Sequence, residues 1–518
     1  MGSEALSFVN EISSKSPYSD RNGAAEKQLA IDQVTKLDRA STSGDLKLDQ
    51  HGLPLIPQPS QWKDDPLNWP HWLKWTVLLQ VSFMAFLGPF NAAVVNPSLV
   101  LLSKGFHESV QRVTYSTQVA IIFGGVASFI WAPLTNYYGR RPVTIVSQVF
   151  AILGQVGAGR SKTYGSLIVS RAINGCGMGG MMSVGTACVA DMFFLHERGE
   201  KTGIYTIFIT NGAHFAAIIG GSIGDAAGWQ WDYYTPAIVT AGSLLVAIFL
   251  FPETLFSRHP DFLANRTHER TYWEMLFYLK GNMIPGRKLG VNDFLTSFYM
   301  CKYPSIVIRT WYYLWSWTFI NILPAISMAK IYTAIYHLKA SPIGVCTGVS
   351  LLIGTLIGEL SAGKLSDYII YQLARRNNGI RMPEQRLYLT ALSAFFMPVG
   401  MIIFGWCIQN KTHFVVPLVG LASGCLGLQI ASTCVYAYVS DCYKPQTPES
   451  GVLLNLARGI SFVVGFFGLQ TAARIGYGWT WTTFALILFV FWFPVLWLML
   501  YGHNWRQRLG TPNFHQFI

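Results

Sequence analysis

The sequence predicts an all-α membrane protein, with twelve transmembrane helices in two pseudo-symmetric six-helix bundles. The 518 residues are 51% hydrophobic and only 12% charged, whereas soluble domains carry about 25% charged residues. Apolar segments about 20 residues long, enough to cross a bilayer as a helix, fill most of the chain beyond residue 70. A repeated motif predicts the pseudo-symmetry of the two halves. Its copies, 231 positions apart, each follow an apolar run: Ala132-Pro-Leu-Thr-Asn136-Tyr137 and Gly363-Lys-Leu-Ser-Asp367-Tyr368.

Composition and motifs exclude several other classes of protein. The net charge is +12, but the basic residues lie in short loops between apolar runs, which fits the positive-inside rule better than nucleic-acid binding. The eight cysteines are scattered, without zinc-ligand spacing, so we expect no metal and no cofactor. The sequence has no HExxH, GxSxG or P-loop motif, and an enzyme is the least favoured class.

Helices follow from the apolar runs because an unpaired backbone in lipid is too costly. Residues 1–62 are polar and poor in aromatics, and we expect a disordered tail there. The expected spans lie near 76–102, 115–136, 142–159, 164–190, 203–226, 235–252, 307–330, 342–363, 387–408, 414–439, 451–474 and 480–501.

The spans divide into two halves around a long basic link. We expect an N-terminal half over 63–254, a central loop over 255–306, a C-terminal half over 307–504 and a tail over 505–518. Lysine and arginine gather in the central loop and in alternate connections, which places both termini and the central loop in the cytoplasm. The expected location is the plasma membrane, with multiple spans.

Arg171 and Glu359, which lie within predicted spans, are the first candidates for proton coupling. An unpaired Arg171 there costs roughly 2.5–3.5 kcal/mol on insertion scales, so it should face a partner or a wet cavity. It either responds to a carboxylate or a proton, or donates to carbonyls of neighbouring helices. Glu359 is the clearest acidic residue within a span. It either takes up a proton during coupling or pairs with Lys364 or a loop arginine.

Further charged groups are candidates for proton coupling or gating. Arg458 and His214 lie within helices eleven and five, where helix packing and simple hydrogen bonding are the alternatives. The remaining candidates lie at cytoplasmic helix ends, where we expect the aspartates to pair with arginines or to cap helices, and so to latch one conformation: Asp191, Asp367, Asp441, Arg140, Arg141 and Arg198.

Polar residues within the spans are candidates to line a substrate path. They are Asn91, Asn96, Asn174, Ser183, Asn321, Gln429, Tyr436 and Tyr438. Prolines can bend their helices and free carbonyls beside these positions. The aromatic residues of helix seven could face an amphipathic or cationic ligand. We expect most of them to face lipid instead: Trp311, Tyr312, Tyr313, Trp315 and Trp317.

Several motifs resemble the major facilitator superfamily over residues 65–505. They are Ala132-Pro-Leu-Thr-Asn136-Tyr-Tyr-Gly139-Arg140-Arg141-Pro142, its second copy Gly363-Lys-Leu-Ser-Asp367, and Arg171-Ala-Ile-Asn-Gly175-Cys-Gly177. Finer segments resemble fungal twelve-span drug:proton antiporters: Asp65-Pro-Leu-Asn-Trp-Pro70, Trp229-Gln-Trp231, Phe251-Pro252-Glu253-Thr254 and Leu454-Asn455-Leu-Ala-Arg458. The resemblance implies that helices one, four, seven and ten line a central path around which the halves rock.

The resemblance implies proton-driven export of small amphipathic organic molecules by alternating access. Two departures leave a proton-coupled importer of an organic cation or nutrient open. Asn136 occupies the signature's acidic position, and Ala216-Ala217 replaces the Gly-Pro of the antiporter motif. A membrane sensor without flux is a weaker alternative. The expected partners are a small-molecule substrate, protons and the lipid bilayer, with no nucleic acid, and the expected state is a monomer.

Overall fold

A computed structural model describes residues 55, 57–258, 263, 266–277, 289–376, 383–443 and 446–510. The chain divides into two units, Met1–Gln61 and Trp62–Ile518. Most of the predicted N-terminal tail, and the end of the C-terminal tail from residue 511, lie outside the described residues. The described part is helical throughout, without strands, and all its long helices belong to the second unit.

Six helical segments form the N-terminal half, and the first of them is broken. It consists of α3 (His71–Ala93), a 3₁₀ turn (Asn96–Ser98) and α4 (Leu99–Phe106). The others are α5 (Val110–Tyr138), α6 (Arg140–Gly159), α7 (Tyr164–Met192), α8 (Leu195–Ala227) and α9 (Trp231–Leu250).

The C-terminal half repeats this order. Its first segment joins α13 (Pro304–Trp317), a π-helical turn (Thr318–Ile322) and α14 (Leu323–Tyr336). The others are α15 (Ala340–Arg376), α16 (Thr390–Gln409) after the 3₁₀ segment Pro383–Leu389, α17 (Val416–Cys442), α18 (Thr447–Ile460) continued through Ser461–Val463 into α19 (Val464–Ile475), and α20 (Tyr477–Leu509).

Eleven segments of the described part are long and apolar enough to cross a membrane. The one remaining predicted span, 164–190, coincides with α7, which contains Arg171, an asparagine and many glycines and serines. These helices confirm the predicted all-α membrane fold.

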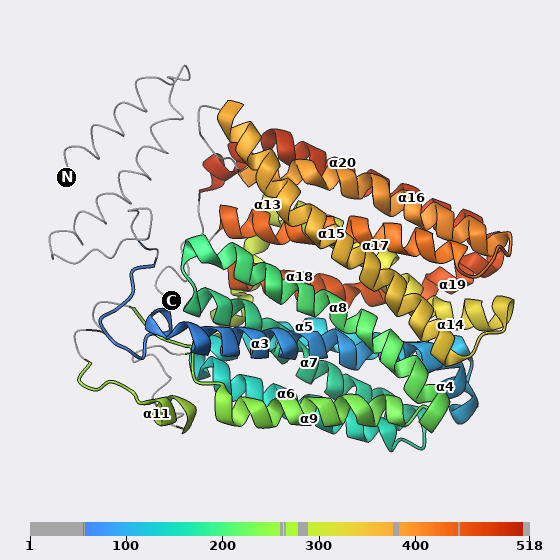
Figure 1. The fold of residues 1–518 in the computed structure, drawn as a ribbon, viewed down its shortest axis with the longest axis horizontal. Coiled ribbons are helices and arrows are strands. Elements are labelled where there is room, and N and C mark those ends of the chain that lie inside the picture. Colours follow the sequence, from blue (N-terminus) through green and yellow to red (C-terminus); the bar gives the residue numbers. More distant parts are fainter. Residues whose placement is uncertain are drawn as a thin grey trace. The chain divides into compact units, whose positions relative to one another are not determined.

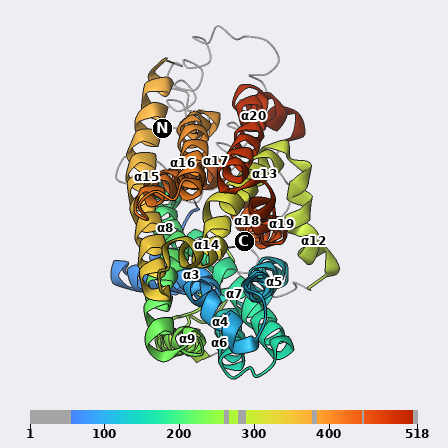
Figure 2. The same ribbon diagram turned by 90° about the vertical axis from the view of Figure 1, so that its right-hand side faces the viewer.

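Matching helices of the two halves pack alike. The second helix packs on the fourth in each half, as α5 on α7 and α15 on α17. The third packs on the fourth and the sixth, as α6 on α7 and α9, and α16 on α17 and α20. Figure 2 looks along the helices, with the blue and green half beside the orange and red half. The halves meet where α5 packs on α18 and α8 packs on α15.

Glycines allow the two halves to approach closely along these contacts. A β-carbon on Gly125 of α5 would lie 2.7 Å from the Cα of Gly459 in α18. A β-carbon on Gly344 of α15 would lie 2.2 Å from the carbonyl oxygen of Ala217 in α8. Both distances are far below van der Waals contact, so only glycine fits.

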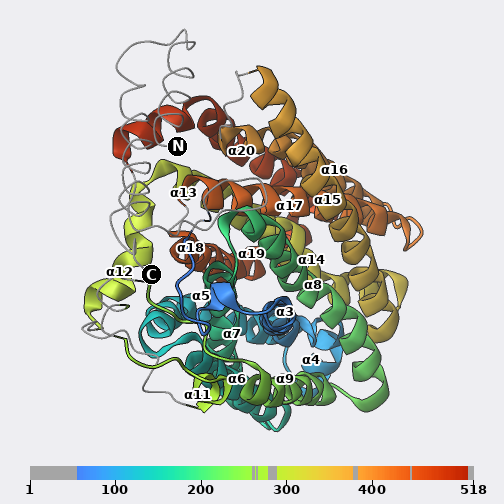
Figure 3. The same cartoon turned by 60° about the vertical axis from the view of Figure 1, so that its left-hand side comes forward.

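One end of the bundle carries the start of α3, the start of α6 with Arg140, and the end of α20 with Arg506 (Figure 1). We call it the basic end, and its opposite the distal end. Two short helices of the central link, α11 (Tyr272–Phe277) and α12 (Val291–Tyr299), lie at the basic end (Figures 1 and 3). Because α12 contacts both α5 and α18, part of the predicted loop bridges the two halves.

Helix eight extends well beyond its predicted end at residue 363. Its helix α15 continues to Arg376, so Asp367 lies within the helix, whereas Asp441 lies in the last turn of α17. The side chains of Asp367, Asp441, Arg198 and Lys364 lie outside the described part of the chain, and the pairings predicted for them stay predictions.

Candidate functional site: a central cavity and a charged network

Matching helix irregularities place an asparagine in the middle of each half. In the first half, α3 ends before Asn96, and the following Pro97 cannot donate a backbone hydrogen bond. In the second half, Asn321 lies in the π-helical turn that precedes Pro324. Such turns are frequent at functional sites because they redirect side chains and free backbone groups.

A central cavity lies between the halves at the level of these irregularities. It holds about 640 Å³ of empty space, and its walls come from both halves, on α3, α5, α7, α8, α13, α14 and α18. Asn96 and Asn321 both line it. They also line an adjoining cavity of about 350 Å³ beside α8 and α15, so the two cavities are neighbours.

Arg458 is the charged member of the cavity wall. Its side chain is 5% exposed. The Nε donates to the hydroxyl of Tyr313 at 2.8 Å, and Nη1 donates to Oδ1 of Asn455 at 3.3 Å. The guanidinium also lies over the rings of Trp317 and Tyr313, 4.7 and 5.5 Å from their centroids. Two aromatic residues of helix seven therefore hold an arginine.

The expectation that most aromatic residues of helix seven face lipid is wrong. Tyr312, Tyr313 and Trp317 are buried, whereas Trp311 is exposed. The buried members fill the core of the C-terminal half, and Trp317 also lines the cavity.

Arg171 lies outside the cavity wall and ties α7 to the broken end of α3. It is fully buried. Its Nη1 and Nη2 donate to the carbonyls of Asn91 and Ala92 at 2.9 and 2.8 Å, and Nη1 also donates to Asn174 at 3.2 Å. These carbonyls belong to the last turn of α3, where a cation also complements the helix dipole. The arrangement matches the alternative in which Arg171 binds carbonyls of a neighbouring helix.

Glu359 joins α15 to α17 rather than lining the cavity. Its Oε2 accepts from Nε2 of Gln429 and from the hydroxyl of Thr433, both at 2.7 Å. The residue is partly buried. The carboxylate of Glu359 thus accepts two hydrogen bonds on one oxygen, both from within the second half.

His214 lies on the seam between the halves. It is fully buried in α8, and its Nδ1 is 3.2 Å from Oδ1 of Asn211 and 3.3 Å from the hydroxyl of Thr355 in α15. Its Nε2 has no hydrogen-bond partner among the described residues. The histidine is therefore one of the few polar groups that connect the two halves.

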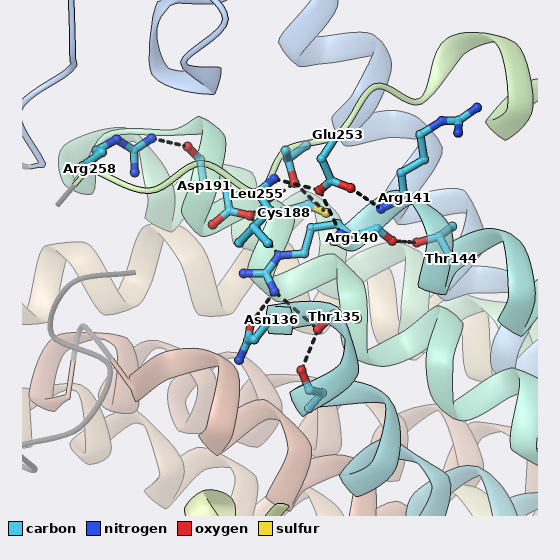
Figure 4. A network of polar contacts seen from close by, with 12 residues as sticks. Thr135, Asn136, Arg140, Arg141, Thr144, Cys188, Asp191, Glu253, Leu255 and Arg258 are labelled. Atoms are coloured by element: carbon cyan, nitrogen blue, oxygen red, sulfur yellow. Dashed lines mark hydrogen bonds and ion pairs between the residues drawn. The ribbon is translucent and has the colours of Figure 1, made fainter. Parts of the chain in front are cut away.

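A charged network occupies the basic end of the N-terminal half (Figure 4). Gly139, with a φ of 108°, allows α6 to begin directly after α5. The Nε of Arg140 binds Oδ2 of Asp191 at 3.1 Å, as the sequence predicts. Nη1 of Arg140 also donates to Asn136, so a neutral amide fills the position where the family signature has an acid. The network thus ties the ends of α5, α6 and α7 together.

Glu253, which belongs to a motif of the family resemblance but had no predicted role, is the centre of this network. Its carboxylate accepts from the backbone amides of Arg140, Arg141 and Leu255 at 2.8, 3.1 and 2.8 Å. It therefore caps the N-terminus of α6 from the segment after α9. Burial raises the pKa of the Glu253 carboxyl, and the three amide donors oppose that shift. Arg141 is anchored nearby, with Nη2 donating to the carbonyl of Ile248 at 2.7 Å.

The predicted path residues therefore separate into two groups. Asn96 and Asn321 line the central cavity, and Ser183 lines a cavity of about 420 Å³ between the halves at the basic end. The others pack between helices, outside the lining of these cavities: Asn91, Asn174, Gln429, Tyr436 and Tyr438. Asn91 bonds to Thr240 of α9 at 3.4 Å, and Tyr436 stacks edge-on against Tyr313.

Three lining or buried groups were missed by the sequence reasoning. Asn455 and Thr117 line the cavity from α18 and α5. Asp232, in the first turn of α9, is fully buried, and the hydroxyl of Ser98 lies beside its carboxylate. Asn455 belongs to the Leu454–Arg458 motif, and Asp232 is an acid between two apolar runs. Both patterns mark the residue, but neither indicates whether its side chain faces the cavity, another helix or lipid.

Comparison with known proteins agrees with the fold. Residues 81–468 match the model of the Major Facilitator Superfamily. Efflux pump vrtL of Penicillium aethiopicum is 26% identical, over 82% of this chain and 85% of its own. MFS transporter cpaT of Aspergillus oryzae is 27% identical, over 80% and 84%. The xylose transporter XylE from E. coli, in a partially occluded inward open conformation, superimposes with a TM-score of 0.60 at 15% identity, covering 83% of this chain and 99% of XylE.

Two repeated helix bundles around a central cavity define a secondary transporter of the membrane, not an enzyme. The chain belongs to the Major Facilitator Superfamily.

Proposed function

We propose that the protein exports small amphipathic organic molecules across the plasma membrane in exchange for protons, with both termini in the cytoplasm. The observation that carries the proposal is the mainly apolar cavity, with a few polar groups, between two pseudo-repeats at their helix irregularities. Substrate sites of such transporters lie at the repeat interface, where helices are interrupted. Relatives named efflux pumps, such as vrtL, support the outward direction.

Glu359 is our first candidate for carrying the coupled proton. Protonation would remove its charge from the donors of Gln429 and Thr433 and so loosen the contact of α15 with α17. Asp232 is the second candidate, because a fully buried carboxylate that pairs with no basic side chain among the described residues is costly when ionised. Arg171 ranks lower for coupling, because its donors are occupied by carbonyls and an amide.

The test is accumulation of labelled amphipathic compounds in yeast cells that lack their own exporters. Cells with the chain should accumulate less than cells without it, and a protonophore should abolish the difference. Export that ignores the protonophore would contradict proton coupling. Equal accumulation across a broad panel would contradict export.

Two variants then locate the proton. Glu359→Gln keeps an acceptor for the donors but cannot ionise, so we expect export to persist at a lower rate and to lose its dependence on the proton gradient. Asp232→Asn tests the second candidate in the same way. Glu200→Gln, at a side chain that is 71% exposed, is the control. Gradient-driven export that survives in both test variants would remove both assignments.

Proton-coupled import is the second candidate function. It is favoured by Ala216 and Ala217, which replace the Gly-Pro of the antiporter motif at the seam between α8 and α15. Higher accumulation in cells with the chain, abolished by the protonophore, would establish import in the same experiment.

A further inference from the structure

The walls of the central cavity are mostly apolar. Small and sulfur-containing side chains, among them Ala92, Ala93, Met178 and Met182, form most of the first half's wall. Among the described residues that line the central cavity or the one beside it, Arg458 alone carries a formal charge. An apolar lining with a few polar side chains is typical of sites that bind small organic molecules.

The charge of Arg458 is not matched by a carboxylate. Its hydrogen-bond partners are the neutral Tyr313 and Asn455, and no ion pair to it occurs among the described residues. By contrast, the buried Arg140 binds Asp191 at 3.1 Å, and Arg506 binds Glu384 at 2.8 Å. Arg458 thus differs from the arginines that serve the ion-pair networks.

One side of the guanidinium stays available. Arg458 uses Nε and Nη1 for its two hydrogen bonds, and Nη2 makes none with the described residues. The ring faces of Trp317 and Tyr313 are already occupied by the guanidinium. A cationic ligand would therefore find a like charge where the aromatic faces would otherwise attract it.

We infer that the substrates are amphipathic organic anions, with an apolar ring body in the central cavity and a carboxylate, or a similar oxyanion, on Arg458. The inference rests on the proposed function as a transporter and names the substrate class of its cavity. Tyr313 and Asn455 hold the guanidinium in place, and the anion takes the donor that they leave free. A charge-assisted bond in a site shielded from water favours the anion over a neutral amide of the same shape.

The test is binding of three probes of one shape to the full chain in lipid nanodiscs. The probes are 2-naphthylacetate, 2-naphthylacetamide and 2-(2-naphthyl)ethylammonium, measured by calorimetry at one pH and salt concentration. We expect the acid to bind about 10-fold tighter than the amide or more, as for hydrogen bonds to a charged group. We expect the amine to bind more weakly than the amide.

Substitutions of Arg458 test whether this arginine causes the preference for the acid over the amide. Arg458→Gln should reduce the acid-to-amide ratio to about one, and Arg458→Lys should restore part of it because the charge returns. Arg112→Gln is the matched control, since Arg112 pairs with Glu108 at the distal end and its side chain is 54% exposed. If Arg458→Gln does not fold, the three probes on the unchanged chain still decide the charge preference.

Several outcomes would overturn the inference. They are an amide or amine that binds as tightly as the acid, an acid preference that persists in Arg458→Gln, and no saturable binding of the acid up to about 1 mM. Binding needs no gradient and has no direction. Loss of export in cells with a retained acid preference would therefore reject the proposed transport cycle and not the substrate class.

Discussion

Single residues at the basic end show how a few polar groups fix helix ends. Glu253 accepts three backbone amides, and Asp191 accepts from both Arg140 and Thr254. The amides that begin a helix lack partners within the helix, so a buried acceptor from elsewhere in the chain is needed. Glu253 meets this need from 113 residues away in sequence.

The first prediction concerns this cap. Glu253→Ala should lower the free energy of unfolding by about 1–3 kcal/mol, because it leaves buried amides without an acceptor. Thermal unfolding of the purified chain in detergent measures the effect. Glu200→Ala changes an exposed carboxylate and should leave the midpoint unchanged. Equal midpoints for Glu253→Ala and the parent chain would show that the cap contributes little.

Buried arginines illustrate that residue type alone does not define a role. Arg171 and Arg458 both lie within predicted spans. Arg171 satisfies carbonyls at the broken end of α3, whereas Arg458 lines the cavity without an acid beside it. The difference comes from the neighbouring helix each one faces, which helix spacing alone does not reveal.

At the scale of elements, the contacts between α5 and α18 and between α8 and α15 determine how closely the halves approach. Both contacts place glycine against backbone of the opposite half. Backbones that touch in this way gain close packing, which drives helix association in lipid. Such contacts also leave no room for a side chain.

The second prediction tests the contact of α5 with α18. Gly125→Ala should reduce stability by about 1–3 kcal/mol through overpacking and should slow export, because the β-carbon would meet Gly459 at 2.7 Å. Thermal unfolding and the accumulation assay measure the two effects. Gly242→Ala in α9 is the control, since a β-carbon there has no neighbour within 4 Å. Equal effects of the two substitutions would contradict a special role for this contact.

At the scale of the whole molecule, the hydrogen bonds between the halves lie in the middle and distal parts of the bundle. Asp225 at the end of α8 accepts from the backbone amides of Ala340 and Ser341 at the start of α15, at 3.3 and 2.6 Å. Gln111 donates to the carbonyl of Gly465. Among the described residues, hydrogen bonds thus hold the halves together at the distal end.

The third prediction concerns this distal closure. Asp225→Ala removes an acceptor at the N-terminus of α15, worth about 0.5–2 kcal/mol for helix caps, so the distal end should open more often. Hydrogen–deuterium exchange should accelerate at the start of α15 and also near Gln111, which does not touch Asp225. Glu108→Ala, which breaks an ion pair within one half, is the control.

Exchange confined to the first turn of α15 would mean that Asp225 acts only as a local cap. Acceleration at both places would mean that the two halves separate there. The distant peptide therefore distinguishes a local effect from a change in the population of whole conformations.

The amino-acid sequence alone determines the fold class, the twelve spans and the two halves, because apolar length and a repeated motif are local properties of the chain. It also predicts that aspartates at helix ends pair with arginines or cap helices, and Asp191 pairs with Arg140. The helix boundaries differ most at helix eight, where α15 continues past the membrane-length segment to Arg376; α8 and α20 also extend beyond their predicted spans.

Only the tertiary structure decides which polar residues line the cavity. Asn96 and Asn321 face it, whereas Asn91, Asn174 and Gln429 pack between helices. Spans that are apolar on almost every face carry no stripe that marks the inner side. The cavity, the cap by Glu253 and the free donor of Arg458 arise when distant segments pack together, so the sequence predicts their residue types without their partners.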